Sequence, residues 1–163
     1  FNSFCRFQHK YTTHILASYA PLFNRIGHSQ WKPDMIWFDD SDVYLTPNYY
    51  VQKLFANHRG TYTIPLQKQD VKLRKEGIYV SAAVDAQGEI ILKLVNTNHR
   101  EYALMLEDAD GLAVRTTGQM WTLRGTGEMP EDRPEVSAVT EETAEIDGCV
   151  FIPAQSLVVI RYQ

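Results

Sequence analysis

The chain has few cysteines and no long apolar segment. Its 163 residues include two cysteines, Cys5 and Cys149, and two thiols so far apart do not form the disulfide framework of a small secreted domain. We interpret them as two separate reduced thiols, which leaves the compartment undetermined between secreted, periplasmic and cytoplasmic. No apolar run is long enough to cross a bilayer, so no membrane partner is expected.

The sequence also lacks an excess of positive charge. Its 16 Lys and Arg are outnumbered by 20 Asp and Glu, which gives a net charge of −4. Proteins that bind nucleic acid usually gather Lys and Arg against the phosphates, so no nucleic-acid partner is expected. With 44% hydrophobic and 22% charged residues, the composition is that of a globular protein with a real core.

Common motifs of catalysis and cofactor binding are missing. The histidines are scattered, and His9 and His14 are five residues apart, one more than in a zinc-binding helical pair. No serine lies in a Gly-x-Ser-x-Gly elbow, and the glycine-containing stretch 124–130 lacks the Lys-Ser/Thr of a phosphate-binding loop. We therefore expect neither a metal ion nor a cofactor.

The chain begins without Met and without a signal-peptide pattern. Residues 4–20 instead carry apolar side chains at three- and four-residue steps, which predicts an amphipathic helix that ends before Pro21. These side chains are Phe4, Phe7, Tyr11, Ile15 and Tyr19. We expect from this start a chain that begins partway through a larger protein.

An acidic cluster, Asp39-Asp40-Ser41-Asp42, lies between two β-prone runs at 35–38 and 43–46. Carboxylates in a group could bind calcium, but an EF-hand loop needs Gly at its sixth position and Glu at its twelfth. Counted from the second Asp, those positions are Leu45 and Val51. We interpret the cluster as the polar turn of a β-hairpin.

A second helix is predicted over residues 46–59. Thr46 suits the N-cap and Pro47 the first helical position, and the apolar stripe consists of Tyr50, Val51, Leu54 and Phe55. His58 and Arg59 would complement the negative end of the helix dipole, and Gly60 would end the helix.

After Gly60 the sequence changes to short β-prone runs separated by turn residues. This pattern of short strands without intervening helices predicts a mainly β fold, an antiparallel β-sandwich of the jelly-roll-like kind. The acidic stretch 125–145 is expected to be a surface connection with one short strand. The runs are 61–66, 77–85, 89–98, 101–108, 112–125 and 149–163.

Three stretches together resemble the C-terminal third of the family 51 glycoside hydrolases, the α-L-arabinofuranosidases. They are residues 17–26, residues 31–40 and the run Thr46-Pro47-Asn48-Tyr49-Tyr50-Val51-Gln52-Lys53-Leu54-Phe55, which is the most specific. The chain also closes on the family's Pro-x-x-Ser-[Leu/Phe]-x-Val pattern, here Pro153, Ser156, Leu157 and Val159. The resemblance covers nearly the whole chain.

The resemblance implies a (β/α)₈ barrel followed by a β-sandwich. Residues 1–60 would be the last helix–strand–helix segment of the barrel, and residues 61–163 the C-terminal sandwich domain. The implied activity is the removal, with retention, of arabinofuranosyl groups from arabinose-containing polysaccharides or oligosaccharides. Retention requires two carboxylates about 5–5.5 Å apart. Both are Glu on earlier barrel strands in the family, so no catalytic residue is assigned here and the chain alone is predicted to be inactive.

Two residues are candidates for substrate contact. If residues 22–26 form the last barrel strand, the loop from His28 to Lys32 faces the active site. Gln30 would then bind a sugar hydroxyl, and Trp31 would stack on the ring or, alternatively, only pack the loop down. If residues 35–39 form that strand instead, Asp39 and Asp40 face the site; we prefer the first register.

Two rival hypotheses remain. In the first, the sandwich is a non-catalytic carbohydrate-binding module, although Trp121 is its one tryptophan. In the second, the chain is a structural interaction domain whose helices 4–20 and 46–59 expose an apolar patch. Such a patch would favour a homo-oligomer.

Overall fold

The computed structural model describes residues 19–163 apart from residues 30, 32–33, 67–68, 126–133 and 136. The elements of this part, in chain order, are β1 (Phe23–Arg25), β2 (Ile36–Phe38), β3 (Val43–Leu45), α2 (Pro47–Asn57), β4 (Tyr62–Ile64), α3 (Gln69–Lys75), β5 (Ile78–Val84), β6 (Ile90–Asn96), β7 (Tyr102–Met105), β8 (Arg115–Arg124), β9 (Val139–Asp147), β10 (Cys149–Ile152) and β11 (Ser156–Tyr162). Neither α2 nor α3 is long and apolar enough to span a membrane.

A six-stranded antiparallel sheet is the centre of the fold, in the order β4-β5-β6-β11-β8-β9. The last strand of the chain, β11, lies in its middle, where Leu157 pairs with Val95 of β6 and with Leu123 of β8. All three side chains are at most 1% exposed. Because both faces of the sheet are covered, β11 is a continuous apolar run over Leu157–Ile160, and the run in β6 is interrupted only by Lys93.

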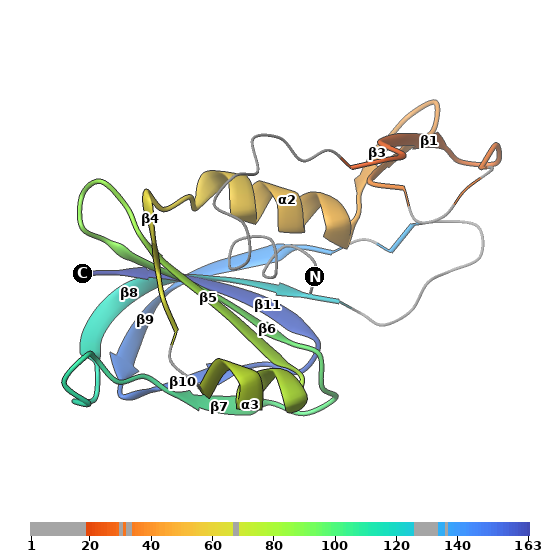
Figure 1. Cartoon of the computed structure of the whole chain (residues 1–163). Coiled ribbons are helices and arrows are strands. Elements are labelled where there is room, and N and C mark those ends of the chain that lie inside the picture. The colour runs from red at the N-terminus through yellow and green to blue at the C-terminus, as the bar shows by residue number, and fades with distance from the viewer. Residues whose placement is uncertain (1–18, 30, 32–33, 67–68, 126–133, 136) are drawn as a thin grey trace.

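Two layers cover the faces of this sheet (Figure 1). The two-stranded sheet β7-β10 and the helix α3 cover one face, and α2 covers the other. The buried members of the first cluster are Ile78, Val80, Ala82, Leu92, Leu94, Leu104, Ile146, Val150, Ile152, Val158 and Ile160. Those of the second are Val51, Leu54, Phe55, Ile91, Val95, Leu123, Leu157 and Val159. The predicted mainly β, antiparallel sandwich is confirmed.

A small three-stranded sheet precedes α2 and lies beyond the end of the sandwich (Figure 1). Its strand β1 pairs in parallel with β2, and β2 pairs antiparallel with β3. The predicted strand at 22–26, the hairpin around the acidic turn and the helix at 46–59 are therefore confirmed. The predicted helix at 4–20 lies almost entirely outside the described residues.

Two elements of the sandwich differ from the sequence prediction. The helix α3 interrupts the β-rich part, although no helix was expected there; it is short, and its Leu73 packs on the first core cluster. The strand β9 has nine residues, and its first seven lie in the stretch 125–145 that was expected to be mostly a surface connection. It is acidic because it is the edge of the sheet and most of its side chains face solvent, where charges discourage edge-to-edge association.

The two ends of α2 also differ in detail. Thr46 occupies the N-cap position, but its hydroxyl donates to the carbonyl of Met35 at 2.7 Å instead of capping the helix. At the other end the C-cap is His58, so Gly60 does not end the helix as predicted. A Cβ at Gly60 would lie 2.3 Å from Cβ of Ala83, so glycine is needed there because two backbones approach closely.

Candidate substrate-facing edge of the small sheet

The parallel pairing of β1 with β2 brings two loops to one edge of the small sheet. Both strands run in the same direction, so the residues that follow Arg25 and Phe38 emerge side by side. The amide of Ile26 donates to the carbonyl of Phe38 at 3.0 Å. Nη2 of Arg25 lies 2.6 Å from Oδ1 of Asp40. Whether residues 22–26 or residues 35–39 are taken as the last barrel strand, the loop that follows the strand therefore starts at this same edge.

Trp31 lies in the connection between β1 and β2 and is 65% exposed. Its carbonyl accepts a hydrogen bond from the hydroxyl of Ser29 at 2.8 Å, and that hydroxyl oxygen accepts one from Nδ2 of Asn24 at 2.7 Å. The described contacts thus hold the loop by its backbone and leave most of the indole open. Gln30, the other predicted contact residue, lies outside the described residues.

The acidic cluster is a closed turn. Oδ1 of Asp39 accepts hydrogen bonds from the amides of Ser41 and Asp42, each at 2.8 Å, and from the Ser41 hydroxyl at 2.9 Å. Tyr44 donates to its other oxygen at 2.9 Å. Led by the amides of Ser41 and Asp42, these donors lower the pKa of Asp39 to about 2. The hydrogen bonds of this carboxylate therefore stabilise the turn of the hairpin.

Asp40 pairs with Arg25 while its own side chain is 88% exposed, and such pairs contribute little to stability. Within the described part of the chain, no group of three or more His, Cys, Asp or Glu side chains is arranged to hold a metal ion.

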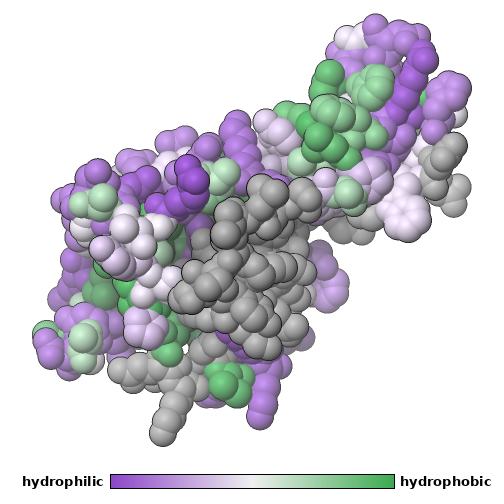
Figure 2. Space-filling model, turned by 45° about the horizontal axis from the view of Figure 1, so that its top comes forward, coloured by the Kyte–Doolittle hydropathy of each residue, from purple (hydrophilic) through white to green (hydrophobic). Residues whose placement is uncertain are grey.

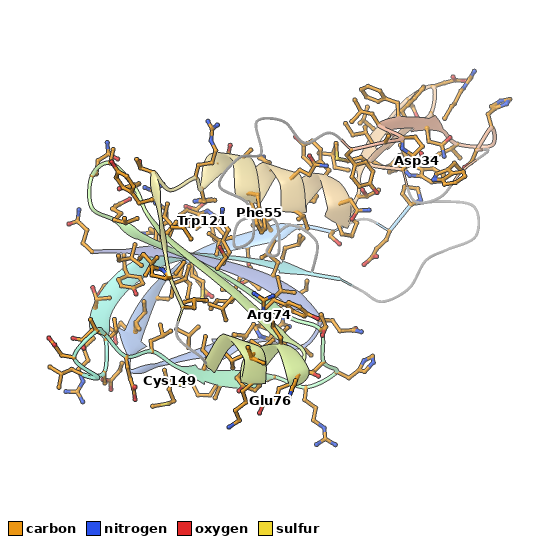
Figure 3. All side chains as sticks on the ribbon, in the orientation of Figure 1. Asp34, Phe55, Arg74, Glu76, Trp121 and Cys149 are labelled. Carbon is orange, nitrogen blue, oxygen red and sulfur yellow. The ribbon has the colours of Figure 1, made fainter. Side chains whose placement is uncertain are left out.

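A polar cluster around the buried Asp34 at the small sheet was not predicted from the sequence. Asp34 is 2% exposed, and its carbonyl accepts from Nε1 of Trp37 at 3.2 Å. Burial and then the charge of Asp34 raise the pKa of Tyr19, while a hydrogen bond from Nδ2 of Asn48 to its hydroxyl at 2.8 Å opposes them. The available signal was Asp34 itself, a charge directly before an apolar strand. Figure 3 shows it at the small sheet.

Two glutamates of the sandwich, Glu76 and Glu89, form hydrogen bonds with other side chains. Oε2 of Glu76 accepts from the hydroxyl of Tyr102 at 2.8 Å, a bond that raises the pKa of Tyr102. Glu89 bonds to Nη2 of Arg161, which also lies 2.5 Å from Oδ2 of Asp85.

Sequence comparison identifies the family. Residues 13–154 match the family model described as "Alpha-L-arabinofuranosidase C-terminal domain". The chain belongs to this family. Over 150 residues it is 31% identical to Alpha-L-arabinofuranosidase 1 of Arabidopsis thaliana, an alignment that covers 86% of this chain and 22% of the relative. A 50-residue part, 31% of this chain, is 46% identical to the extracellular exo-alpha-L-arabinofuranosidase of Streptomyces chartreusis and covers 6% of it.

The fold agrees with this membership. A GH51 α-L-arabinofuranosidase solved with bound arabinose superposes with a TM-score of 0.72 at 23% identity, over 90% of this chain and 24% of that one. The thermostable GH51 enzyme of Thermotoga petrophila superposes with a TM-score of 0.56 at 17% identity, over 80% of this chain and 31% of that one. The chain spans about a fifth of the length of Alpha-L-arabinofuranosidase 1 of Arabidopsis thaliana.

Proposed function

We propose that this chain is the C-terminal part of a retaining α-L-arabinofuranosidase that acts on arabinose-containing hemicellulose. The observation that carries the proposal is the match of residues 13–154 to the C-terminal domain of these enzymes. The relatives it aligns with are named as arabinofuranosidases and are several times longer. The catalytic carboxylates would belong to the part of the enzyme that this chain does not contain.

Within such an enzyme, residues 1–60 would complete the catalytic barrel and residues 61–163 would form the sandwich domain. The pairing of β1 with β2 supports this division, because it is the only parallel pair among the described strands. Barrels of this class consist of parallel strands, whereas sandwiches are antiparallel.

The sandwich would support the barrel mechanically. The helix α2 continues directly from β3 and buries Val51, Leu54 and Phe55 against the six-stranded sheet. Burial of each such side chain stabilises the folded state by roughly 1.5–3 kcal/mol. This contact would fix the position of the small sheet and of the loop edge that it carries.

Gln30 and Trp31 remain our proposed substrate contacts. The open indole of Trp31 and the position of its loop at the carboxyl ends of two parallel strands support this role, since barrel active sites lie at that end. In the full-length enzyme, Trp31→Ala should raise KM for an arabinofuranoside at least several-fold, while a matched exposed variant such as Tyr62→Ala should not.

The proposal is tested with the purified chain and with the full-length enzyme. The chain should not hydrolyse a chromogenic arabinofuranoside, and the full-length enzyme should hydrolyse it and release arabinose first as the retained anomer by NMR. Turnover by the chain alone would overturn the assignment of the catalytic groups to the missing part. A full-length protein that is inactive on arabinofuranosides would overturn the proposed activity.

The same chain can be tested for the alternative of carbohydrate binding by affinity electrophoresis in arabinan or xylan. Trp121, the one tryptophan of the sandwich, is half-buried, and its ring packs against His58 at a centroid distance of 4.1 Å. It therefore offers no open platform, and unchanged mobility is expected. A clear retardation would favour a binding module.

A further inference from the structure

His58, the residue that ends α2, is buried between this helix and the six-stranded sheet. His58 is 7% exposed and packs against Trp121, and among the described residues its Nδ1 has no hydrogen-bond partner. A buried cation lies on the same face of the sheet: Lys93 is 2% exposed, with Nζ 4.4 Å from the ring centroid of Phe55. Figure 3 shows Phe55 and Trp121 between α2 and the sheet.

The sheet surface that faces His58 carries charges of both signs, because Arg161 is paired there with Asp85 and Glu89. Lys93 of β6, Val159 of β11, Trp121 of β8 and Glu141 of β9 form one row of paired residues across the sheet. Arg161 follows two residues after Val159 and therefore lies on the same face. Lys93, Arg161 and Glu141 are the charged groups that act on His58, and Tyr79 of β5 contributes a hydroxyl-bearing ring to the same cluster.

We propose that His58 makes the docking of α2 on the sheet sensitive to acid: the helix stays docked while the imidazole is neutral and is released when the imidazole is protonated. An imidazolium has two N–H donors, and at Nδ1 it would present a buried, charged donor without an acceptor. It would also place a further cation beside Lys93 and Arg161.

One contact opposes this effect. A cation over the face of an indole ring is stabilised, so packing against Trp121 favours the imidazolium. Glu141 acts in the same direction. Burial, followed by the charges of Arg161 and Lys93, outweighs both and lowers the pKa of His58 to about 4.

The sign of the pH dependence follows from that shift. An unfolded histidine has a pKa near 6.5, so between pH 6.5 and pH 4 the unfolded chain binds more protons than the folded one. The stability associated with His58 is therefore complete above about pH 6.5 and is lost as the pH falls towards about 4. Because α2 connects the small sheet to the sandwich, its release would free the edge that carries Trp31.

The test compares thermal unfolding of the chain with that of His58→Phe at pH 7.5 and pH 5.0. Phenylalanine keeps a ring against Trp121 and cannot be protonated. Between these pH values the wild-type midpoint should fall by about 5 °C more than that of the variant. His99→Gln, at an exposed turn, is the matched control and should behave as wild type. Equal losses in the wild type and His58→Phe would overturn the proposal.

A second measurement does not depend on the variant. NMR titration should find the His58 ring neutral at pH 5 in the folded chain. Hydrogen exchange should show that α2 loses more protection than β11 when the pH falls from 7.5 to 5, because transient release of the helix becomes easier. A titration midpoint near 6.5 in the folded state, or equal loss of protection in α2 and β11, would contradict the acid-sensitive docking.

Discussion

At the scale of single residues, Asn96 connects several chain segments of the sandwich. It lies at the end of β6 and is 1% exposed. Its Nδ2 donates to the carbonyls of Arg100 at 2.8 Å, Ile152 at 3.0 Å and Pro153 at 3.1 Å. Its Oδ1 accepts from the amide of Asn98 at 2.9 Å. A single amide side chain of β6 therefore satisfies backbone groups at the end of β10 and in the loop that follows β6.

Asn96→Ala should lower the free energy of unfolding by about 2–4 kcal/mol, because it leaves several buried backbone groups without a partner. Chemical denaturation monitored by circular dichroism measures the loss. Gln119→Ala is the matched control: Gln119 donates to Thr143 at 3.1 Å on the surface, and its removal should change the stability by at most about 0.5 kcal/mol. A comparable loss in both variants would contradict the bridging role of Asn96.

Asp39 determines the acid behaviour of the hairpin turn. The pKa of its carboxyl is lowered to about 2. The ionised carboxylate therefore stabilises the folded chain fully above the unfolded pKa near 4, and this stabilisation is lost as the pH falls through about 2. Asp39→Asn removes this titration and should flatten the fall of the unfolding midpoint between pH 4 and pH 2. Asp110→Asn serves as the control, and an unchanged slope in Asp39→Asn would refute the assignment.

At the scale of elements, the pairing of β4 with β5 in the six-stranded sheet brings two backbones close together at Gly60. Gly60 precedes β4 and lies against β5, where the amide of Thr61 donates to the carbonyl of Val84 at 2.7 Å. A Cβ on Gly60 would lie 2.3 Å from that of Ala83 and 3.1 Å from the carbonyl oxygen of Val84. The edge strand can approach its neighbour only because residue 60 has no side chain.

Gly60→Ala should therefore destabilise the chain by about 1–3 kcal/mol through overpacking. The double variant Gly60→Ala/Ala83→Gly removes the closer of the two clashes, so a double-mutant cycle should give a favourable coupling of at least about 0.5 kcal/mol. Additive effects of the two substitutions would show that the contact with Ala83 is not the cause.

At the scale of the whole molecule, the small sheet exposes an apolar face. Phe23 and Val43 are 61% and 65% exposed. Ile36, Phe38 and Leu45 alternate onto the same face by their pairing. Figure 2 shows apolar residues gathered on this part of the surface. The rival hypothesis of an interaction domain predicts such a patch on helices 4–20 and 46–59. For residues 46–59 that prediction is wrong, because Val51, Leu54 and Phe55 are buried against the sandwich.

This face should make the chain associate with itself. Val43→Glu places a charge in its middle and should reduce the concentration-dependent rise in apparent mass measured by sedimentation or light scattering. Gln119→Glu adds the same charge on the six-stranded sheet and should leave the association unchanged. A wild-type chain that stays monomeric at high concentration would contradict this prediction.

The sequence by itself determined the class of the fold, the acidic hairpin turn, the helix after Thr46 and the family. Each depends on local periodicity, turn chemistry or a contiguous motif, all of which can be read along the chain. Tertiary structure alone decided the pairing of β1 with β2, the close approach at Gly60 and the burial of His58 and Asp34. These features depend on which distant segments become neighbours. A residue such as His58, suited by position to a charged helix end, becomes a buried neutral group only when a sheet formed by later strands covers it.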